Sequence, residues 1–240
     1  MKLYCFLIIF VALTANAFAK EIKVAVGLAL PPYFISEDNS GMEYEIVKEA
    51  LAYKGHTIKT IYVPFARVTK ELENYSVDAA ATVNSSSGLK GVYYSESHIT
   101  YQNVAIALKK NNFVINSIQD LGKYSIVGFQ NATSYLGENF AKIAKSNEKY
   151  IEIANQEAQT RMLFTGRADV LVGDINIFKY YREKISGSDK QQEISIYQLF
   201  TPVKYSCAFA SEDLKNDFDQ GLKKLKSSAR YNEIIKKYTK

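Results

Sequence analysis

The segment IKVAVGL (22–28) opens a region in which β-rich and helical patterns alternate regularly, and this alternation determines the fold class. Gly55 and Pro64 punctuate this stretch, since Gly commonly follows a helix and Pro commonly opens one. The resulting β-α-β-α-β order predicts an α/β domain with a mostly parallel sheet. After 22–28, the patterns in chain order are a helix at 42–54 (MEYEIVKEALAYK), a strand at 57–63, a helix at 65–75 (FARVTKELENY) and a strand at 77–83.

The second half of the chain resumes the alternation after an interruption. A Gly/Ser loop, NSSSGLKG (84–91), and a long strand-like run, HITYQNVAIAL (98–108), separate the two halves. The later strand patterns lie at 124–129, 150–153, 168–172, 194–199 and 203–210, and the helical patterns at 134–145, 156–165, 175–185, 211–226 and 231–237.

These patterns predict two α/β lobes joined by two hinge strands. We expect lobe 1 to contain residues 20–103 and 208–240, and lobe 2 to contain residues 104–207. The extended crossings are expected near 103–107 and 204–208. A chain that crosses twice between lobes forms a hinge, and ligands of two-domain proteins usually bind in the cleft between the domains.

The first nineteen residues have the pattern of a secretory signal peptide. Lys2 precedes an apolar run at 3–13 (LYCFLIIFVAL), and Ala17 and Ala19 occupy the small-residue positions before a cleavage site. The run is shorter than the about 20 residues that a stable membrane span needs, although an N-terminal membrane anchor is the alternative. We therefore expect cleavage after residue 19 and a periplasmic location.

The composition of the 240-residue chain is that of an ordinary globular protein, with 47% hydrophobic and 23% charged residues, which excludes disorder, collagen and coiled coil. The net charge of +5 is spread without a dense block of Lys and Arg, so no nucleic-acid partner is expected. Only Cys5, Cys207, His56 and His98 offer thiol or imidazole groups, and they form no metal-binding motif, so neither a metal nor another cofactor is expected. Cys207 lies in a strand pattern that predicts a buried thiol.

Several short motifs occur in an order that resembles the type 2 periplasmic solute-binding proteins, in the amino-acid-binding (family 3) branch of ABC importers. LALPPYF (28–34) resembles the first cleft loop of that family, and TGRADVLVGD (165–174) resembles its "G-R-x-D … D" stretch. YSCAFAS (205–211) and YNEIIKKY (231–238) resemble its returning hinge strand and its last helix. The resemblance implies two α/β lobes that close on a small ligand and present it to a membrane permease.

The resemblance also implies ligand-binding roles for individual residues. Asp174 would hold the ammonium group of the ligand, although a carboxylate at that place also caps a helix. Phe65 would stack on the ligand and Tyr33 would form part of the wall; for both, core packing is the alternative. Thr133 would donate a hydrogen bond to the ligand, or would simply cap the helix that follows.

The arginine that binds the ligand carboxylate in this family has no counterpart here. The family pattern "T-x-T-x-x-R" is replaced by TVNSSSGLKGVYYSESH (82–98), which is shorter and contains no Arg. Gly88 or Lys90 falls near the place of the arginine, and Ser85 offers a hydroxyl from the same loop. The candidates for a replacement cation are Lys90, Arg67 and Arg161; for each arginine the alternative is a solvated helix face.

The sequence therefore predicts a monomeric binding protein and no catalytic residue. It would capture a small polar, amine-bearing ligand, an amino acid or a related compound, for an ABC importer. One alternative is a sensory subunit that acts on a receptor in trans. A less favoured alternative is a periplasmic enzyme on the same fold, which would need a general acid and base that the sequence does not show.

Overall fold

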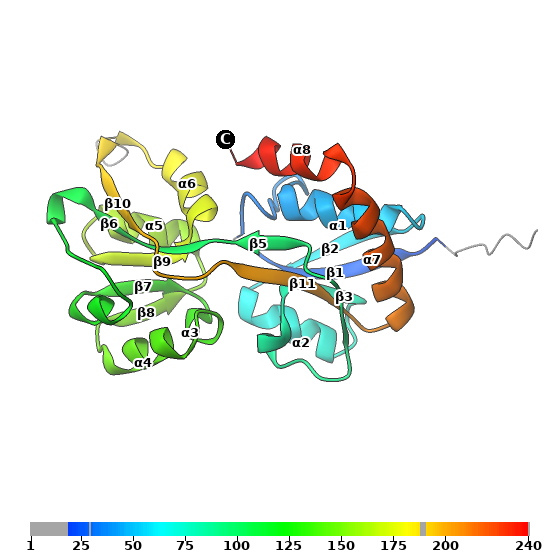
Figure 1. The fold of residues 1–240 in the computed structure, drawn as a ribbon, viewed down its shortest axis with the longest axis horizontal. Coiled ribbons are helices and arrows are strands. Elements are labelled where there is room, and N and C mark those ends of the chain that lie inside the picture. The colour runs from blue at the N-terminus through cyan, green and yellow to red at the C-terminus, as the bar shows by residue number, and fades with distance from the viewer. Residues whose placement is uncertain (1–18, 29, 188–190, 240) are drawn as a thin grey trace, which may run out of the picture.

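The structure of the chain is a computed structural model that describes residues 19–28, 30–187 and 191–239. The predicted signal peptide lies outside the described residues except for Ala19. Within the described part, the strands form two sheets, and two extended connections join the lobes built on them (Figure 1). The two-lobed α/β fold expected from the sequence is confirmed.

Lobe 1 is built on a sheet with the strand order β2-β1-β3-β11-β4, and β5 pairs with β11 at its side. β1 pairs in parallel with β2 and β3, as the β-α-β-α-β pattern predicts, whereas β11 runs antiparallel to β3, β4 and β5. Helices α1 and α7 cover one face of this sheet and α2 covers the other (Figure 1). The strands are β1 (Glu21–Gly27), β2 (Thr57–Val63), β3 (Ala79–Val83), β4 (Tyr93–Tyr94), β5 (Ile99–Tyr101) and β11 (Val203–Phe209). The helices are α1 (Met42–Ala52), α2 (Val68–Glu73), α7 (Glu212–Lys226) and α8 (Ala229–Tyr238), with short 3-10 turns at Phe65–Arg67 and Ser85–Ser87.

Lobe 2 is built on a sheet with the order β10-β6-β9-β7-β8. β7 is parallel to β8 and β9, whereas β6 is antiparallel to β9 and β10. The strands are β6 (Asn103–Leu108), β7 (Ile126–Phe129), β8 (Tyr150–Ile153), β9 (Val170–Asp174) and β10 (Ile194–Tyr197). The helices are α3 (Ala132–Tyr135), α4 (Glu138–Ser146), α5 (Gln156–Phe164) and α6 (Ile175–Glu183), with 3-10 turns at Lys109–Asn111 and Gln119–Lys123.

Each lobe has its own core. In lobe 1, alternate residues of β1 are buried against the apolar face of α1, which includes Ile46 and Leu51. α7 approaches α1 closely at Gly221, where an added Cβ would collide with the backbone carbonyl of Ala50. In lobe 2, the strands β6, β7 and β9 are buried on both faces, as expected for central strands covered by helices.

The lobes are connected at two places, and the structure puts the second earlier than the sequence suggested. The run at 98–108 is not one strand: β5 belongs to lobe 1 and β6 to lobe 2, with Gln102 between them. The return connection lies between Tyr197 and Val203, because from Val203 onward β11 pairs with β5 of lobe 1. The strand-like run passes through Gln102 without a break, and the gap at 200–202 does not by itself show that the chain changes lobe there.

Candidate ligand-binding site

A pocket of about 330 Å³ lies between the two lobes, at the carboxyl ends of several strands. Thr82 belongs to β3, Phe129 ends β7 and Asp174 ends β9, and each of these strands is part of a parallel pair. Loops at this end of α/β sheets are where such folds bind ligands, because the polar strand ends and helix starts meet there. The volume is in the range of sites for small molecules.

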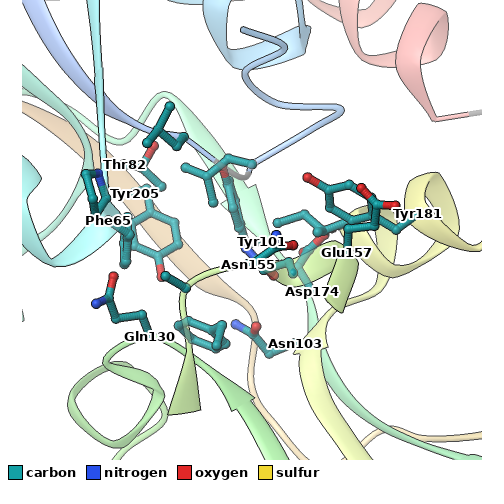
Figure 2. Close-up of a pocket in the computed structure, with 17 residues that line it drawn as sticks. Phe65, Thr82, Tyr101, Asn103, Gln130, Asn155, Glu157, Asp174, Tyr181 and Tyr205 are labelled. Atoms are coloured by element: carbon teal, nitrogen blue, oxygen red, sulfur yellow. Dashed lines mark hydrogen bonds between the residues drawn. The ribbon is translucent and has the colours of Figure 1, made fainter. Parts of the chain in front are cut away.

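The lining mixes five aromatic, five aliphatic and five uncharged polar residues with two acidic ones. Its charged residues are Glu157 and Asp174; among the lining residues that the structure describes, there is no Lys, Arg or His. Phe65 and Gln130 lie toward one end of the pocket, and Tyr181 and Glu157 toward the other (Figure 2). The aromatic residues of the lining are Phe65, Tyr101, Phe129, Tyr181 and Tyr205, and the uncharged polar ones are Thr82, Asn103, Gln130, Asn155 and Gln156.

Asp174 is 3% exposed, and its carboxylate accepts hydrogen bonds from both lobes. Oδ1 accepts from the backbone N–H groups of Asn176 and Ile177, which is the N-cap arrangement of α6, at 2.8 and 3.1 Å. Oδ2 accepts from the backbone N–H of Gln102 at 2.8 Å and from the hydroxyl of Tyr33 at 3.0 Å. Burial raises the pKa of Asp174 to about 6, although these hydrogen bonds favour its charged form.

Tyr33 lies behind Asp174 rather than in the lining. Its ring stacks on the ring of Tyr101 with centroids 3.6 Å apart, and its hydroxyl accepts a hydrogen bond from Asn176 Nδ2. Burial and the neighbouring Asp174 charge raise the pKa of Tyr33 well above its ordinary value. Tyr33 is therefore a neutral hydroxyl at pH 7 that donates to the carboxylate and fixes its orientation.

A buried polar cluster supports the lobe 1 wall of the pocket. Glu43 is fully buried in α1 and accepts hydrogen bonds from the hydroxyls of Thr82 (2.9 Å) and Tyr101 (2.7 Å). His98 Nε2 lies 2.8 Å from Glu43 Oε1, and Cys207 is buried beside the same imidazole, as the sequence predicted for this thiol. Thr82 has a φ of +59°, which is unusual for a β-branched residue, and its bond to Glu43 holds it there.

Asn103 presents an unused donor to the pocket. It is 2% exposed, and its Nδ2 has no hydrogen-bond partner in the described part of the chain. It faces Asp174 directly in the β6–β9 ladder, so the two side chains lie on the same face of the sheet. A buried amide donor without an acceptor is costly and points to a polar group that the site receives from outside.

The structure brings two of the sequence-predicted ligand-binding residues into the lining, Asp174 and Phe65. Arg67 and Arg161 instead pair with glutamates of their own helical turns, at 3.0 Å to Glu71 and 2.8 Å to Glu157. The remaining predicted residues that lie outside the lining are Tyr33, Ser85, Lys90 and Thr133.

Thr133 contacts a carboxylate of the chain itself. Glu152 accepts hydrogen bonds from the backbone N–H of Asn131, from both the N–H and the hydroxyl of Thr133, and from the hydroxyl of Tyr150. The distances are 2.7, 3.0, 3.0 and 2.7 Å in that order. The donors of this loop are therefore engaged by an internal anion.

Sequence reasoning missed most of the lining, including Thr82, Asn103, Glu157 and Tyr205. The signal that identifies three of them is positional: Thr82, Asn103 and Glu157 lie at or next to a strand end or a helix start. Tyr205 lies inside β11 and has no such signal. The pairing of β11 with β5 and the break at Gln102 decide which residues reach that edge, and neither is visible in the pattern of apolar residues.

The lobes touch each other around the pocket. Besides the bond from Tyr33 to Asp174, the backbone N–H of Ala66 in lobe 1 donates to Gln130 Oε1 in lobe 2 at 3.1 Å. The rings of Phe65 and Tyr135 pack across the same gap with centroids 5.5 Å apart. The lobes are thus in direct contact on either side of the pocket.

Comparison with known proteins identifies the family. The chain belongs to the bacterial extracellular solute-binding proteins, family 3, whose family model matches residues 22–240. It is 24% identical over 231 residues to the L-cystine-binding protein TcyJ of Bacillus subtilis, with 92% of this chain and 84% of that protein covered. Among solved structures, an ancestral arginine-binding protein bound to arginine has the same fold, with 21% identity, a TM-score of 0.75, and 92% of this chain and 98% of that chain covered. A histidine kinase sensor domain with similarity to periplasmic binding proteins also shares it, at 16% identity, a TM-score of 0.75, and 91% and 94% coverage.

Two further observations concern the residues that the structure describes. Within residues 19–28, 30–187 and 191–239, no group of three or more His, Cys, Asp or Glu side chains is arranged to hold a metal ion. In the same residues, no helix combines the length and the apolar character that crossing a membrane requires.

Proposed function

We propose that this protein captures a small polar, amine-bearing ligand between its two lobes and presents it to the permease of an ABC importer. The observation that carries the proposal is the acidic, aromatic pocket between the lobes, in which the buried carboxylate of Asp174 faces a cavity without a described cation. The related protein TcyJ binds L-cystine, which also carries ammonium groups, and this supports an amine-bearing ligand.

In this proposal, Asp174 supplies the charge that attracts the ligand and Phe65 supplies an apolar wall. Tyr33 positions Asp174 by donating to Oδ2 while it stacks on Tyr101. None of the other predicted residues lines the pocket. Arg161 acts indirectly by holding Glu157, and no ligand contact is assigned to Arg67, Thr133, Ser85 or Lys90.

Binding is coupled to closure of the lobes about the two connections. The open form exposes the pocket to solvent, and closure brings Tyr33 to Asp174 and Ala66 to Gln130. A ligand that contacts both lobes stabilises the closed form in proportion to its preference for that form. The permease then distinguishes the loaded from the empty protein by the relative position of the lobes.

A thermal-shift screen of the purified protein tests this function. The compounds are amino acids, amines, polyamines, short peptides and small organic acids. A ligand at a hundred times its Kd stabilises the folded protein by about 2.7 kcal/mol. For a chain of this size, that stabilisation raises the Tm by roughly 5–10 °C. Stabilisation by an amine-bearing compound supports the proposal, and no stabilisation by any class contradicts it.

Location and assembly need separate measurements. We propose that the chain is exported, cleaved after residue 19 and monomeric. The N-terminal sequence of the exported protein is then expected to begin at Lys20, and light scattering is expected to give the mass of one chain.

The fold alone does not decide between transport and sensing, because a histidine kinase sensor domain shares it. Loss of uptake of the ligand on deletion of the gene supports transport, whereas loss of a transcriptional response with normal uptake supports a sensory subunit. Recovery of the bound compound unchanged after prolonged incubation separates both from an enzyme.

A further inference from the structure

We infer that the ligand is a small organic cation that carries an uncharged hydrogen-bond acceptor and no carboxylate. This inference rests on the proposed function and specifies the chemical class that the same pocket accepts. Three observations carry it: the signs of the charges in the lining, the internal carboxylate already bound by the loop at Asn131 and Thr133 outside the lining, and the unpaired donor of Asn103.

The charges of the lining oppose a ligand carboxylate. Glu157 and Asp174 are both anionic groups, and no described lining residue is a cation. The nearby guanidinium of Arg161 donates two hydrogen bonds to Glu157 Oε1, at 3.2 and 2.8 Å, and does not line the pocket. A carboxylate that enters this pocket loses its water and gains two like charges without a partner, which is strongly unfavourable.

The donors that resemble an anion-binding loop are already used. Glu152 accepts hydrogen bonds from Asn131, Thr133 and Tyr150, as described above. A ligand carboxylate would have to displace this internal carboxylate, which would then lose all four bonds. These donors of the loop therefore already have an acceptor within the chain and do not need one from a ligand.

Asn103 requires an acceptor, and its position requires that the acceptor be neutral. Its buried Nδ2 has no partner in the described part of the chain, and it lines the pocket. Because Asn103 and Asp174 are direct partners in the β6–β9 ladder, a group that accepts from Asn103 lies close to the Asp174 carboxylate. A hydroxyl or carboxamide oxygen meets both conditions, whereas a carboxylate oxygen is repelled.

The cationic part of the ligand is favoured by charge and by aromatic surface. All four hydrogen bonds of Asp174 come from the chain, which is about the number that a carboxylate can accept. Asp174 therefore attracts a cation mainly through its charge. Phe65, Tyr181 and Tyr205 supply rings on which an alkylammonium or guanidinium group gains cation–π energy.

Matched ligands test the inference by isothermal titration calorimetry. The probes form two series: L-lysine, L-lysinamide and cadaverine, and L-arginine, L-argininamide and agmatine. Each amide replaces only the carboxylate of its amino acid by a neutral group that keeps an acceptor oxygen. We expect the amide to bind at least about tenfold more tightly than the amino acid, since one unpaired buried charge is removed.

The outcomes separate this inference from the proposed function. An amino acid that binds as tightly as its amide overturns the inference and leaves the proposed function standing. If no probe binds but the broader screen finds a ligand, a carboxylate on that ligand overturns the inference and a carboxylate-free cation supports it. If no compound of either set binds, the proposed function fails and the inference fails with it.

Asn103→Ala tests the acceptor half of the inference. The ratio of the affinities of argininamide and agmatine is the readout, because a general disturbance of the pocket weakens both ligands together. We expect the variant to lower the affinity for argininamide by about fivefold to tenfold and to leave that for agmatine within about twofold, as expected for loss of one hydrogen bond. An unchanged ratio would show that Asn103 does not donate a hydrogen bond to an acceptor on the ligand.

Discussion

The hydroxyl of Tyr33 in lobe 1 donates a hydrogen bond to Oδ2 of Asp174 in lobe 2, across the gap that forms the ligand pocket. This bond joins residues 141 positions apart in the chain and completes the set of donors around a buried carboxylate. It makes one of the two carboxylates that line the pocket a point of contact between the lobes. Asp174 is therefore both the N-cap of α6 and the acceptor of a hydrogen bond from the other lobe.

Asp174→Asn is predicted to abolish binding of amine-bearing ligands while the protein stays folded. Asn keeps an acceptor oxygen for the N-cap of α6 and removes the charge that attracts the cation. We expect the affinity to fall by at least about a hundredfold, since an ionic contact in a buried site contributes several kcal/mol. Calorimetry measures the affinity, and circular dichroism verifies the fold. Undiminished binding would show that Asp174 does not contribute to ligand binding.

Binding is predicted to weaken as the pH falls through about 6, the pKa to which burial raises Asp174. The ligand cation favours the ionised carboxylate, so protonation competes with binding. Each pH unit below the pKa is expected to cost up to about tenfold in affinity. A titration between pH 7.5 and pH 5, made with agmatine or another hit whose charge is constant over this range, measures the effect. An affinity of the wild-type protein that does not change over this pH range would contradict the role of ionised Asp174 in binding.

The same group sets a pH dependence of stability without ligand. Because the pKa of Asp174 in the folded protein, about 6, lies above its ordinary value of 3.8, the folded state holds more protons between these two values. The contribution of Asp174 to stability is therefore complete below about pH 3.8 and is lost as the pH rises through 6, by up to about 3 kcal/mol. Urea unfolding at pH 4.5 and pH 7.5 compares the wild type with Asp174→Asn. Between these pH values, the free energy of unfolding of the wild type is expected to fall relative to that of the variant. A relative rise would contradict the raised pKa of Asp174.

Glu157→Gln is predicted to weaken cation binding about threefold to tenfold, because Glu157 contributes a partly exposed second negative charge to the lining. Glu138→Gln is the matched control. Both glutamates begin helices of lobe 2 and pair with a cation four residues later, Arg161 and Lys142, but Glu138 does not line the pocket. Equal losses of affinity from the two substitutions would mean that Glu157 acts through the overall charge of the lobe and not through its place in the lining.

Glu43→Ala is predicted to destabilise the protein by about 3–5 kcal/mol, since it leaves buried donors without an acceptor. The donors belong to Thr82, His98 and Tyr101. Glu49→Ala, on the exposed side of the same helix, removes a surface pair with Arg230 and is expected to cost about 1 kcal/mol or less. Denaturant unfolding of both variants measures the difference. Similar losses would show that the buried cluster is not a structural support of the pocket wall.

Much of the architecture follows from local patterns. The strand at 57–63 and the strand at 150–153 have the bounds that the sequence predicts. Both are rich in β-branched and aromatic residues, and Pro64 directly follows the first. The helix expected at 134–145 is divided into α3 and α4 at Gly137, whose φ of 86° ends the first piece. The change of sheet at Gln102 depends on tertiary pairing and has no local signal.

The site is less predictable than the fold for the same reason. Asp174 and Phe65 follow recognisable strand ends, and the structure places both in the lining. Asn103 and Tyr205 lie in strand-like stretches whose side chains reach the pocket only because the lobes face each other. Arg67 and Arg161 illustrate the reverse: their charges stand out in the sequence, yet each pairs with a glutamate of its own helical turns.

A crystal structure grown with the most stabilising compound of the thermal-shift screen would show the ligand in its site. We predict that the compound lies between Phe65 and Tyr181, with its cationic group next to Asp174 and an uncharged oxygen within hydrogen-bond distance of Asn103 Nδ2. A compound bound elsewhere on the protein, or bound in the pocket with a carboxylate directed at Asn103 and Asp174, would contradict this prediction.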